Sequence, residues 1–255
     1  MVEPAAYFLS DAHLGKNLPY DPERERRLLH LLASIEKVAT HLFILGDLFD
    51  FWIEYRDAIR PDYFMTLYAL RRLVDGGTKV HYMAGNHDFA LGNFLTDTIG
   101  ITVHPGAWET HIQGKRLFLH HGDGLLHTDT AYRLLKSVLR NQTNQKIFKL
   151  LPPTLGIAIA SYFSCKSRNS HTPEEILKRS KDYRAKAKSI VQKGYDWVFF
   201  GHTHRPELTR WDAGGYCNTG DWLIHNSFAV MQRSEVRLWL YEDNGSHIPY
   251  PLSLP

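Results

Sequence analysis

Carboxylate, imidazole and amide side chains gather in five short clusters along this chain of 255 residues. Such oxygen and nitrogen donors, with no thiolate among them, suit divalent cations such as Mn²⁺, Mg²⁺, Fe²⁺ or Zn²⁺. Because seven candidate ligands exceed what one tetrahedral site needs, the set predicts two neighbouring ions. The candidates are Asp11, His13, Asp47, Asn86, His121, His202 and His204.

The spacing within two of these clusters favours shared ions. Residues i and i+2 of an extended segment project to the same side, so Asp11 and His13 can reach one metal together. His202 and His204 have the same spacing but need not share an ion. The two carboxylate oxygens of Asp47 can serve two cations, so this residue can bridge them. A single Asp-x-His or His-x-His pair is more often structural, and the case for a site depends on five clusters in order.

Each cluster directly follows a short apolar run that is typical of a buried strand. The runs are Tyr7–Leu9, Leu42–Leu45, Val80–Ala84, Leu117–Leu119 and Trp197–Phe200. Between several of them the apolar residues have helical spacing, over Asp21–Val38, Tyr63–Val74 and Glu174–Lys193. Strands that alternate with helices predict an α/β fold, in which the polar clusters meet beyond the carboxyl ends of the strands.

Two regions do not follow this alternation of strands and helices. Strand-like pieces at Tyr216–Asn218, Ser227–Gln232 and Val236–Tyr241 predict a second, more antiparallel sheet packed on the first. No clear strand occurs over about residues 124–184, which we expect to form a helical cap inserted into a single domain of residues 1–255. The apolar stretch Ile147–Phe163 within it predicts either a buried helix pair or a surface for lipid or membrane contact.

Composition restricts the partners and the compartment. The net charge is only +3, and the absence of a dense basic stripe gives nucleic-acid binding little support. Cys165 and Cys217 are far apart and form no disulfide framework, which favours a reducing compartment. The polar start of the sequence predicts no signal peptide. The sequence also has no run of about twenty apolar residues, so we expect no transmembrane helix. We therefore expect a cytoplasmic protein.

The clusters DAH, GDLFD, GNHD, HHGD and GHTH resemble, in order, the motifs of the calcineurin-like metallophosphoesterases, over residues 8–204. The resemblance implies a β-sandwich flanked by helices (αββα), and hydrolysis of a phosphate ester or anhydride with two metal ions. It implies one ion site of Asp11, His13, Asp47 and His204. It implies a second site of Asp47, Asn86, His121 and His202, with Asp47 bridging the two.

The same resemblance assigns roles beside the ligands. His87 stands where the family has its general acid or electrostatic stabiliser, and Asp50 resembles the carboxylate that orients that histidine. We choose His121 over His120 as the ligand because the family's ligand directly precedes Gly-Asp. Asp123 is then a candidate for orienting a ligand imidazole.

Longer matches resemble one branch, the UDP-2,3-diacylglucosamine pyrophosphatases of lipid A synthesis. The matching segments are GDLFDFWIEY, the GNHDF and LG pieces at Gly85–Gly92, HHGDGLLHTD and FGHTHRP. The branch implies cleavage of a UDP-linked acylated sugar into UMP and a lipid monophosphate. We expect Mn²⁺ as the ion, an apolar slot for acyl chains, and peripheral contact of the cap with the inner membrane. The candidate substrate-binding residues are Asn86, His87, Lys166, Arg168, Asn169 and Ser170.

His87 departs from this branch, in which arginine stands at the same position. The chain therefore fits two interpretations. One is a variant that still cleaves the lipid precursor. The other is a metallophosphodiesterase or phosphatase with a different, soluble nucleotide or phosphoester substrate. A catalytically inactive binding module is disfavoured because every ligand position is filled.

Overall fold

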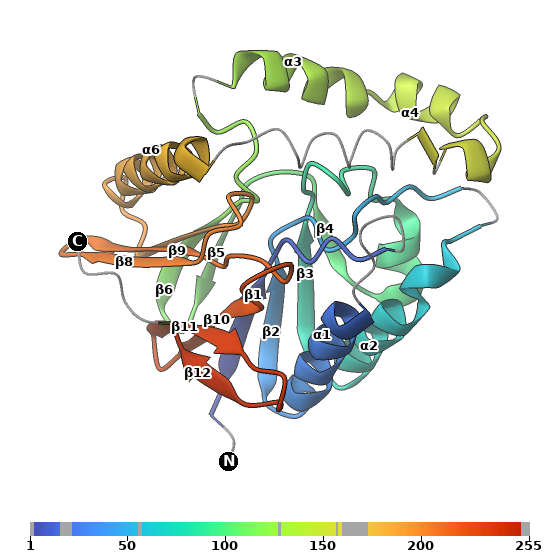
Figure 1. Ribbon diagram of the computed structural model, residues 1–255. Helices are drawn as coiled ribbons and strands as arrows, with labels where there is room; N and C mark the ends of the chain where they lie inside the picture. Colours follow the sequence, from blue (N-terminus) through green and yellow to red (C-terminus); the bar gives the residue numbers. More distant parts are fainter. Residues whose placement is uncertain are drawn as a thin grey trace.

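The computed structural model describes residues 3–15, 22–55, 58–126, 129–156, 158–159 and 173–250. Two β-sheets pack face to face, and helices cover their outer faces (Figure 1). The strands of the first sheet are β1 (Ala5–Leu9), β2 (Ala39–Ile44), β3 (Lys79–Met83), β4 (Thr102–His104), β10 (Ser227–Gln232), β11 (Glu235–Tyr241) and β12 (His247–Pro249). Their order across the sheet is β12-β11-β10-β1-β2-β3-β4.

The second sheet has the order β5-β6-β7-β9-β8. Its strands are β5 (Trp108–Ile112), β6 (Lys115–Leu119), β7 (Trp197–Phe200), β8 (Glu207–Trp211) and β9 (Gly214–Asn218). The inner faces of the two sheets meet in an aromatic core, where the Phe8 ring stacks on Phe43 at 4.8 Å and on Phe199 at 4.0 Å between centroids. Burial of these large rings holds the two sheets together.

Helices cover both outer faces, as the predicted αββα fold class requires. The described helices are α1 (Pro22–Ile35), α2 (Phe64–Asp75), α3 (Thr130–Leu139), α4 (Gln142–Phe148) and α6 (Pro173–Val191), with short turns η1 (Pro61–Tyr63) and η2 (Phe94–Ile99). Helix α1 buries Leu28, Leu31, Leu32 and Ile35 against the first sheet, which is the face that the sequence predicts. Helix α6 packs Tyr183 and Ala187 on the second sheet. The predicted fold class is confirmed.

The prediction for the C-terminal strands is wrong in part. Strands β10 and β11 do not form a second sheet, because β10 pairs antiparallel with β1 and extends the first. Only β9 joins the second sheet, parallel to β7. A short apolar run that is buried on both faces predicts a strand, but it does not predict the strand with which it pairs.

Helices α3 and α4 lie across the end of the sandwich where the strands β1, β2 and β3 finish (Figure 1). Two cations, one on α3 and one directly after it, hold the helix there. Lys136 Nζ lies 2.6 Å from Asp123 Oδ2. Arg140 donates hydrogen bonds to the carbonyls of Pro105 and Gly85, at 2.6 and 3.0 Å. The predicted end of the cap, residue 184, falls inside α6, which continues to Val191.

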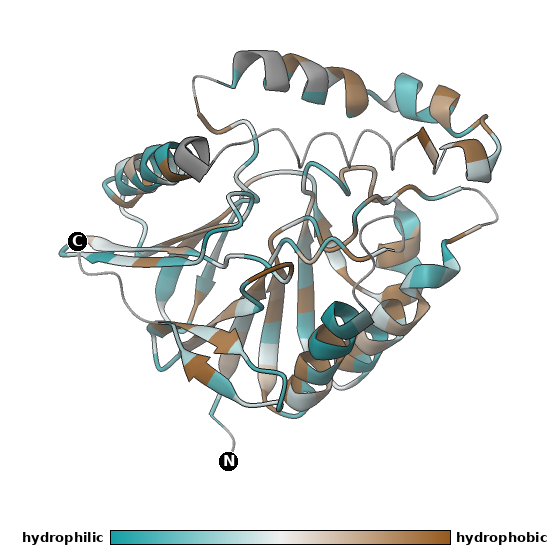
Figure 2. Ribbon diagram, in the orientation of Figure 1, coloured by the Kyte–Doolittle hydropathy of each residue, from teal (hydrophilic) through white to brown (hydrophobic). Residues whose placement is uncertain are grey.

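The cap segment around α3 and α4 carries large apolar side chains that are exposed to water. Leu134 on α3 is 69% exposed, and Leu150, just after α4, is 83% exposed. Ile147 and Val138 are also exposed, and Figure 2 shows hydrophobic segments along α3 and α4. Among the described residues, no helix has the length and apolar character needed to cross a membrane.

Candidate metal centre

All seven predicted ligands lie in loops that directly follow strands, and the structure brings them into one cluster. The loops after β1, β2, β3, β6 and β7 supply Asp11 and His13, Asp47, Asn86, His121, and His202 and His204, respectively. Asp11, His13, Asp47 and His121 are fully or almost fully buried. Ligands that come from distant parts of the chain therefore meet at one edge of the sandwich, as open α/β sheets arrange their sites.

The backbone at this cluster is strained. Asp11, His13, Asp47, His202 and His204 all have positive φ angles, between 44° and 68°. Residues with a Cβ rarely occupy this left-handed region, and such strain concentrates at functional sites. Each of these residues turns sharply out of its strand, and the turn directs its side chain to a shared point instead of along a sheet face.

Two motif glycines allow the loops to approach one another. A Cβ atom at Gly85 would lie 2.0 Å from Asp47 Oδ1, and one at Gly201 would lie 2.5 Å from Asp11 Oδ2. Any other residue at either position would collide with a candidate ligand. The glycines of GNHD and GHTH are therefore part of how the ligands are packed.

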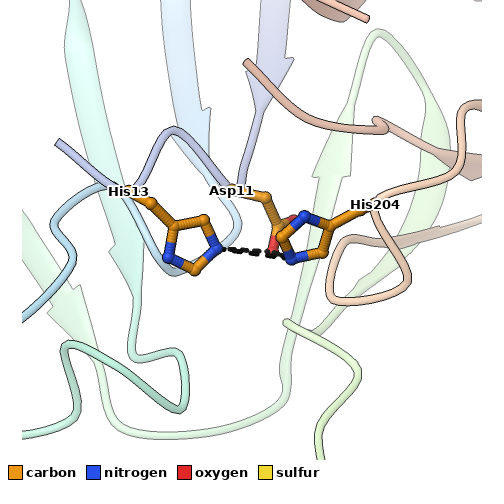
Figure 3. Close-up of side chains that lie close together, drawn as sticks. All are labelled: Asp11, His13 and His204. Atoms are coloured by element: carbon orange, nitrogen blue, oxygen red, sulfur yellow. Dashed lines mark hydrogen bonds and ion pairs between the residues drawn. The ribbon is translucent and has the colours of Figure 1, made fainter. Parts of the chain in front are cut away.

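Asp11, His13 and His204 form the first group of donors, and Figure 3 shows their side chains pointing toward one another. Asp11 Oδ1 lies 3.4 Å from His204 Nε2 and 3.8 Å from His13 Nε2. The two Nε2 atoms are 3.3 Å apart. Within the described part of the chain, no group donates a hydrogen bond to the buried Asp11 Oδ1. An anionic oxygen in this position is suited to a cation.

Asn86, His121 and His202 form the second group. Asn86 Oδ1 lies 2.9 Å from His121 Nε2 and 2.8 Å from His202 Nδ1. The Nδ1 atom of His121 donates to the Leu45 carbonyl at 2.7 Å, so Nε2 is the nitrogen that faces the other candidate ligands. This arrangement is how proteins orient a metal-binding imidazole.

Asp47 lies between the two groups. Its Oδ2 atom is 3.4 Å from His121 Nε2 and 3.8 Å from His13 Nε2. Its Oδ1 atom accepts a hydrogen bond from the His87 main-chain N–H at 2.8 Å. Asp47 is thus the carboxylate that lies near a histidine of each donor group.

The electrostatics of the cluster favour added positive charge. Burial lowers the pKa of His121, but the carboxylates of Asp47, Asp11 and Asp123 together outweigh burial and raise that pKa to about 10. The pKa of Asp47 is well below its ordinary value, because His121 and His87 oppose the effect of burial. Burial and the nearby His121 lower the pKa of His202 to about 3, so His202 is a neutral imidazole. The donor set fits divalent cations, which would neutralise the two buried carboxylates.

Comparison with known proteins identifies a family and several relatives of this chain. The family described as calcineurin-like phosphoesterase matches residues 6–206. This chain belongs to that family. It is 31% identical to a UDP-2,3-diacylglucosamine hydrolase of Porphyromonas gingivalis, over 93% of this chain and 97% of that protein. A protein of the same name from Proteus mirabilis is 30% identical over 82% of this chain and 85% of its own length. The solved structure of an archaeal phosphodiesterase covers 92% of this chain and 99% of its own, with 14% identity and a TM-score of 0.49.

Family membership makes this calcineurin-like phosphoesterase a metal-dependent phosphoester hydrolase. The divalent metals that the family implies have a donor set at the described cluster, where groups of three potential ligands lie within 4.8 Å of one another. His87 belongs to one of these groups, with His13 and Asp47.

His87 and Asp50 lie together beside this cluster. The nearest Asp50 atom to His87 Nδ1 is the main-chain oxygen, which accepts a hydrogen bond at 3.1 Å. The Asp50 carboxylate is farther, with Oδ1 at 3.8 Å. The edge of the His87 ring contacts the His13 ring at 4.6 Å between centroids. Both the main-chain oxygen and the carboxylate of Asp50 therefore lie on the Nδ1 side of the imidazole.

The neighbouring HHGD residues have different surroundings. His120 accepts a hydrogen bond from the Gly122 N–H through its Nδ1 atom at 2.8 Å, and it belongs to none of the donor groups. Burial lowers its pKa to about 4. The Asp123 carboxylate pairs with Lys136 of the cap, at 2.6 Å, so its role in this phosphoesterase includes holding α3.

Sequence reasoning assigned no role to two buried carboxylates of this phosphoesterase. Asp221 Oδ2 lies 3.6 Å from His204 Nδ1, opposite the nitrogen that faces Asp11. Asp88 accepts the N–H groups of Asp47 at 3.1 Å and of Gly85 at 3.0 Å, so it ties two ligand loops together. The signals were present: Gly-Asp follows β9 at 220–221 as it follows β2 at 46–47, and Asp88 completes GNHD.

The predicted substrate-binding residues separate into two sets. Asn86 and His87 lie at the donor cluster. The other four, Lys166, Arg168, Asn169 and Ser170, lie outside the described residues, so their role remains a prediction.

Proposed function

We propose that this phosphoesterase hydrolyses the diphosphate of UDP-2,3-diacylglucosamine to UMP and 2,3-diacylglucosamine 1-phosphate, using two Mn²⁺ ions. One observation carries the hydrolytic part: two donor groups converge from five loops and share Asp47 Oδ2. The substrate follows from the Porphyromonas gingivalis relative, whose name states that substrate and whose similarity covers nearly both chains.

The residues of each donor group would hold one ion. Asp11, His13 and His204 would hold the first, Asn86, His121 and His202 the second, with Asp47 common to both. Bound as a pair, such ions activate water as a nucleophile and neutralise the charge of the phosphoryl oxygens. The protein fixes the donors beforehand through the strained turns and the hydrogen bond from His121 to Leu45, so no reorganisation is needed when substrate arrives.

His87 supplies the proton chemistry in this proposal. Its Nδ1–H is engaged by the Asp50 carbonyl, which leaves Nε2 as the nitrogen that exchanges a proton with substrate. Only 8% of its side chain is exposed, so the imidazole acts in a largely dry environment. A protonated His87 would stabilise negative charge on the phosphoryl group or donate its Nε2 proton to the departing oxygen.

The cap supplies the apolar part of the substrate site. Leu134, Ile147 and Leu150 keep large apolar surfaces in water on helices that lie across the strand ends. Exposure of this kind is costly unless a lipid or another apolar surface covers it. We assign it to acyl chains and to peripheral contact with the cytoplasmic face of the inner membrane. Lys146 and Lys149 on and after α4 would complement anionic headgroups.

The decisive experiment compares substrates side by side. The purified protein is loaded with Mn²⁺ and given UDP-2,3-diacylglucosamine or bis(p-nitrophenyl) phosphate, and UMP or p-nitrophenol is quantified. We expect a much higher kcat/KM for the lipid substrate. Hydrolysis of the soluble ester alone would refute the lipid substrate and favour the soluble phosphodiesters that the histidine at position 87 also fits.

A further inference from the structure

Arg179, on α6, lies beside a candidate metal ligand and contacts the base of the cap. Its Nη2 atom is 3.5 Å from His202 Nε2 and 3.7 Å from Asp129 Oδ1. Asp129 stands at the start of α3, where the chain enters the cap, whereas α6 is where the chain leaves it. About a third of the Arg179 side chain, 31%, is exposed. The Arg179 side chain therefore has His202 and Asp129 as neighbours and is partly open to solvent.

The orientation of His202 decides what Arg179 can bind. His202 turns Nδ1 toward Asn86 Oδ1 and the other donors, so Nε2 faces Arg179. A neutral imidazole that ligates through Nδ1 carries its proton on Nε2, and a guanidinium has donors only. With the ion in place, the Arg179 and His202 N–H groups would both be donors. The guanidinium then needs an acceptor other than His202.

Asp129 only partly fills that need. Its carboxylate does not cap α3, and at 3.7 Å it is too far from Arg179 for a hydrogen bond. The other oxygen, Oδ2, is buried and has no hydrogen-bond partner within the ranges that the structure describes. An arginine has five N–H donors, so donors remain for a ligand beside the contacts of Arg179 with Asp129 and with the Tyr183 hydroxyl.

We propose that Arg179 binds a phosphoryl oxygen of the bound substrate, on the cap side of His202. A planar guanidinium matches the spacing of phosphate oxygens and donates two parallel hydrogen bonds to them. Arg179 would thus hold the diphosphate against the metal centre and link substrate binding to both ends of the cap. The assignment deepens the proposed function, because the diphosphate is the group that Arg179 would recognise.

The test measures phosphate binding and metal content separately. Inorganic phosphate is titrated into the Mn²⁺-loaded full-length protein by calorimetry, for wild type, Arg179→Met and Arg179→Lys, and bound Mn²⁺ is measured by elemental analysis. We expect Arg179→Met to weaken phosphate binding about 10–100-fold, the usual loss for a charged hydrogen bond. Arg179→Lys keeps the charge without the planar donors, so its affinity should be intermediate. The Mn²⁺ content should not change.

Lys181→Met is the matched control, because Lys181 is an exposed cation two residues along the same helix. It should bind phosphate as the wild type does. Unchanged affinity in Arg179→Met, or no phosphate binding by the wild type, would overturn the assignment. A loss of Mn²⁺ would also overturn it, by showing that Arg179 holds His202. A wild type that binds phosphate but does not cleave UDP-2,3-diacylglucosamine would refute only the proposed substrate.

Discussion

Two groups of histidines on this sandwich have nearly the same nitrogen spacing and very different surroundings. At the candidate metal centre, His13 Nε2 and His204 Nε2 are 3.3 Å apart. At the edge of the first sheet, His81 Nδ1 and His104 Nε2 are 3.2 Å apart. The edge group continues as a stack of rings, with His104 on Trp108 at 4.1 Å between centroids.

The two groups differ in charge and in backbone. The candidate metal centre contains the buried carboxylates Asp11 and Asp47, and five of its seven residues have left-handed backbone conformations in the loops after their strands. His81 and His104 lie within the regular strands β3 and β4. Burial lowers the pKa of His121, but Asp47, Asp11 and Asp123 together raise it to about 10. By contrast, burial, His104, His41 and Lys79 all lower the pKa of His81, to about 4. Close nitrogens are therefore not sufficient for a cation site: buried carboxylates and turns that aim the donors are also required.

Replacing the shared carboxylate should have the largest effect. Asp47→Ala removes an oxygen from both donor groups, and such ions contribute several kcal/mol to phosphoryl transfer. We therefore expect kcat/KM to fall at least about 10⁴-fold on any substrate. Bound metal, measured by elemental analysis after gel filtration, should also fall. The matched control is His104→Gln, which disrupts the other close nitrogen pair and should change neither quantity. A metal loss in His104→Gln as large as that in Asp47→Ala would break the comparison.

His87 belongs to the metal cluster by contact, and we expect its removal to slow the chemistry without releasing metal. Proton transfer by a positioned side chain contributes about 10²–10⁴-fold, so His87→Ala should lower kcat roughly 10²–10³-fold. Single-turnover rates and Mn²⁺ content would be measured on the same samples. His87→Arg is an informative second variant, because it keeps a cation at the position and should retain more activity. If metal content and rate fell together, His87 would be a ligand instead.

Asp221 should have a smaller effect, on metal affinity. It lies 3.6 Å from His204 Nδ1 and accepts the main-chain N–H groups of Ile224 and His225, both at 2.9 Å. A carboxylate behind a ligand imidazole typically contributes about 10–100-fold in metal affinity. We expect Asp221→Asn to weaken Mn²⁺ binding by that factor and to recover most activity at saturating Mn²⁺. Unaltered Mn²⁺ titrations would show that Asp221 holds only its own loop.

The comparison also shows why part of this site was predictable from sequence. Asp11, Asp47, Asn86, His121 and His202 each stand directly after an apolar strand, and parallel strand ends share one edge of a sheet. That local signal placed the ligands without knowledge of the sheets. It did not show that β10 pairs with β1, because strand pairing is a contact between residues far apart in the chain.

Residues that act through another residue were harder to predict. Asp221 and Arg179 contact His204 and His202 across long separations in sequence, and neither lies in the five clusters. Arg179 occupies a helix position that also reads as an ordinary charge on a solvated face. The role that we propose for Arg179 follows only from the position of α6 beside His202.

We expect the smallest effect at the edge group, where protonation of His81 should lower the stability of the fold at acidic pH. The folded-state pKa of His81 is about 4, below its ordinary value of 6.5. Between these pH values the unfolded chain binds more protons than the folded chain, so stability falls as the pH drops from about 6.5 to 4. Partial exposure of His81 to water reduces the size of this effect.

His81→Phe keeps a ring in the stack and removes the titrating group. Wild type and variant should therefore differ in how far Tm drops between pH 7 and pH 5, by about 2 °C, with less loss in the variant. The histidines of the metal centre titrate in both proteins, so their contribution cancels in this difference. An equal drop in Tm would show that protonation of the stacked edge group does not affect stability. The difference in charge between the two histidine groups would then have no effect on stability.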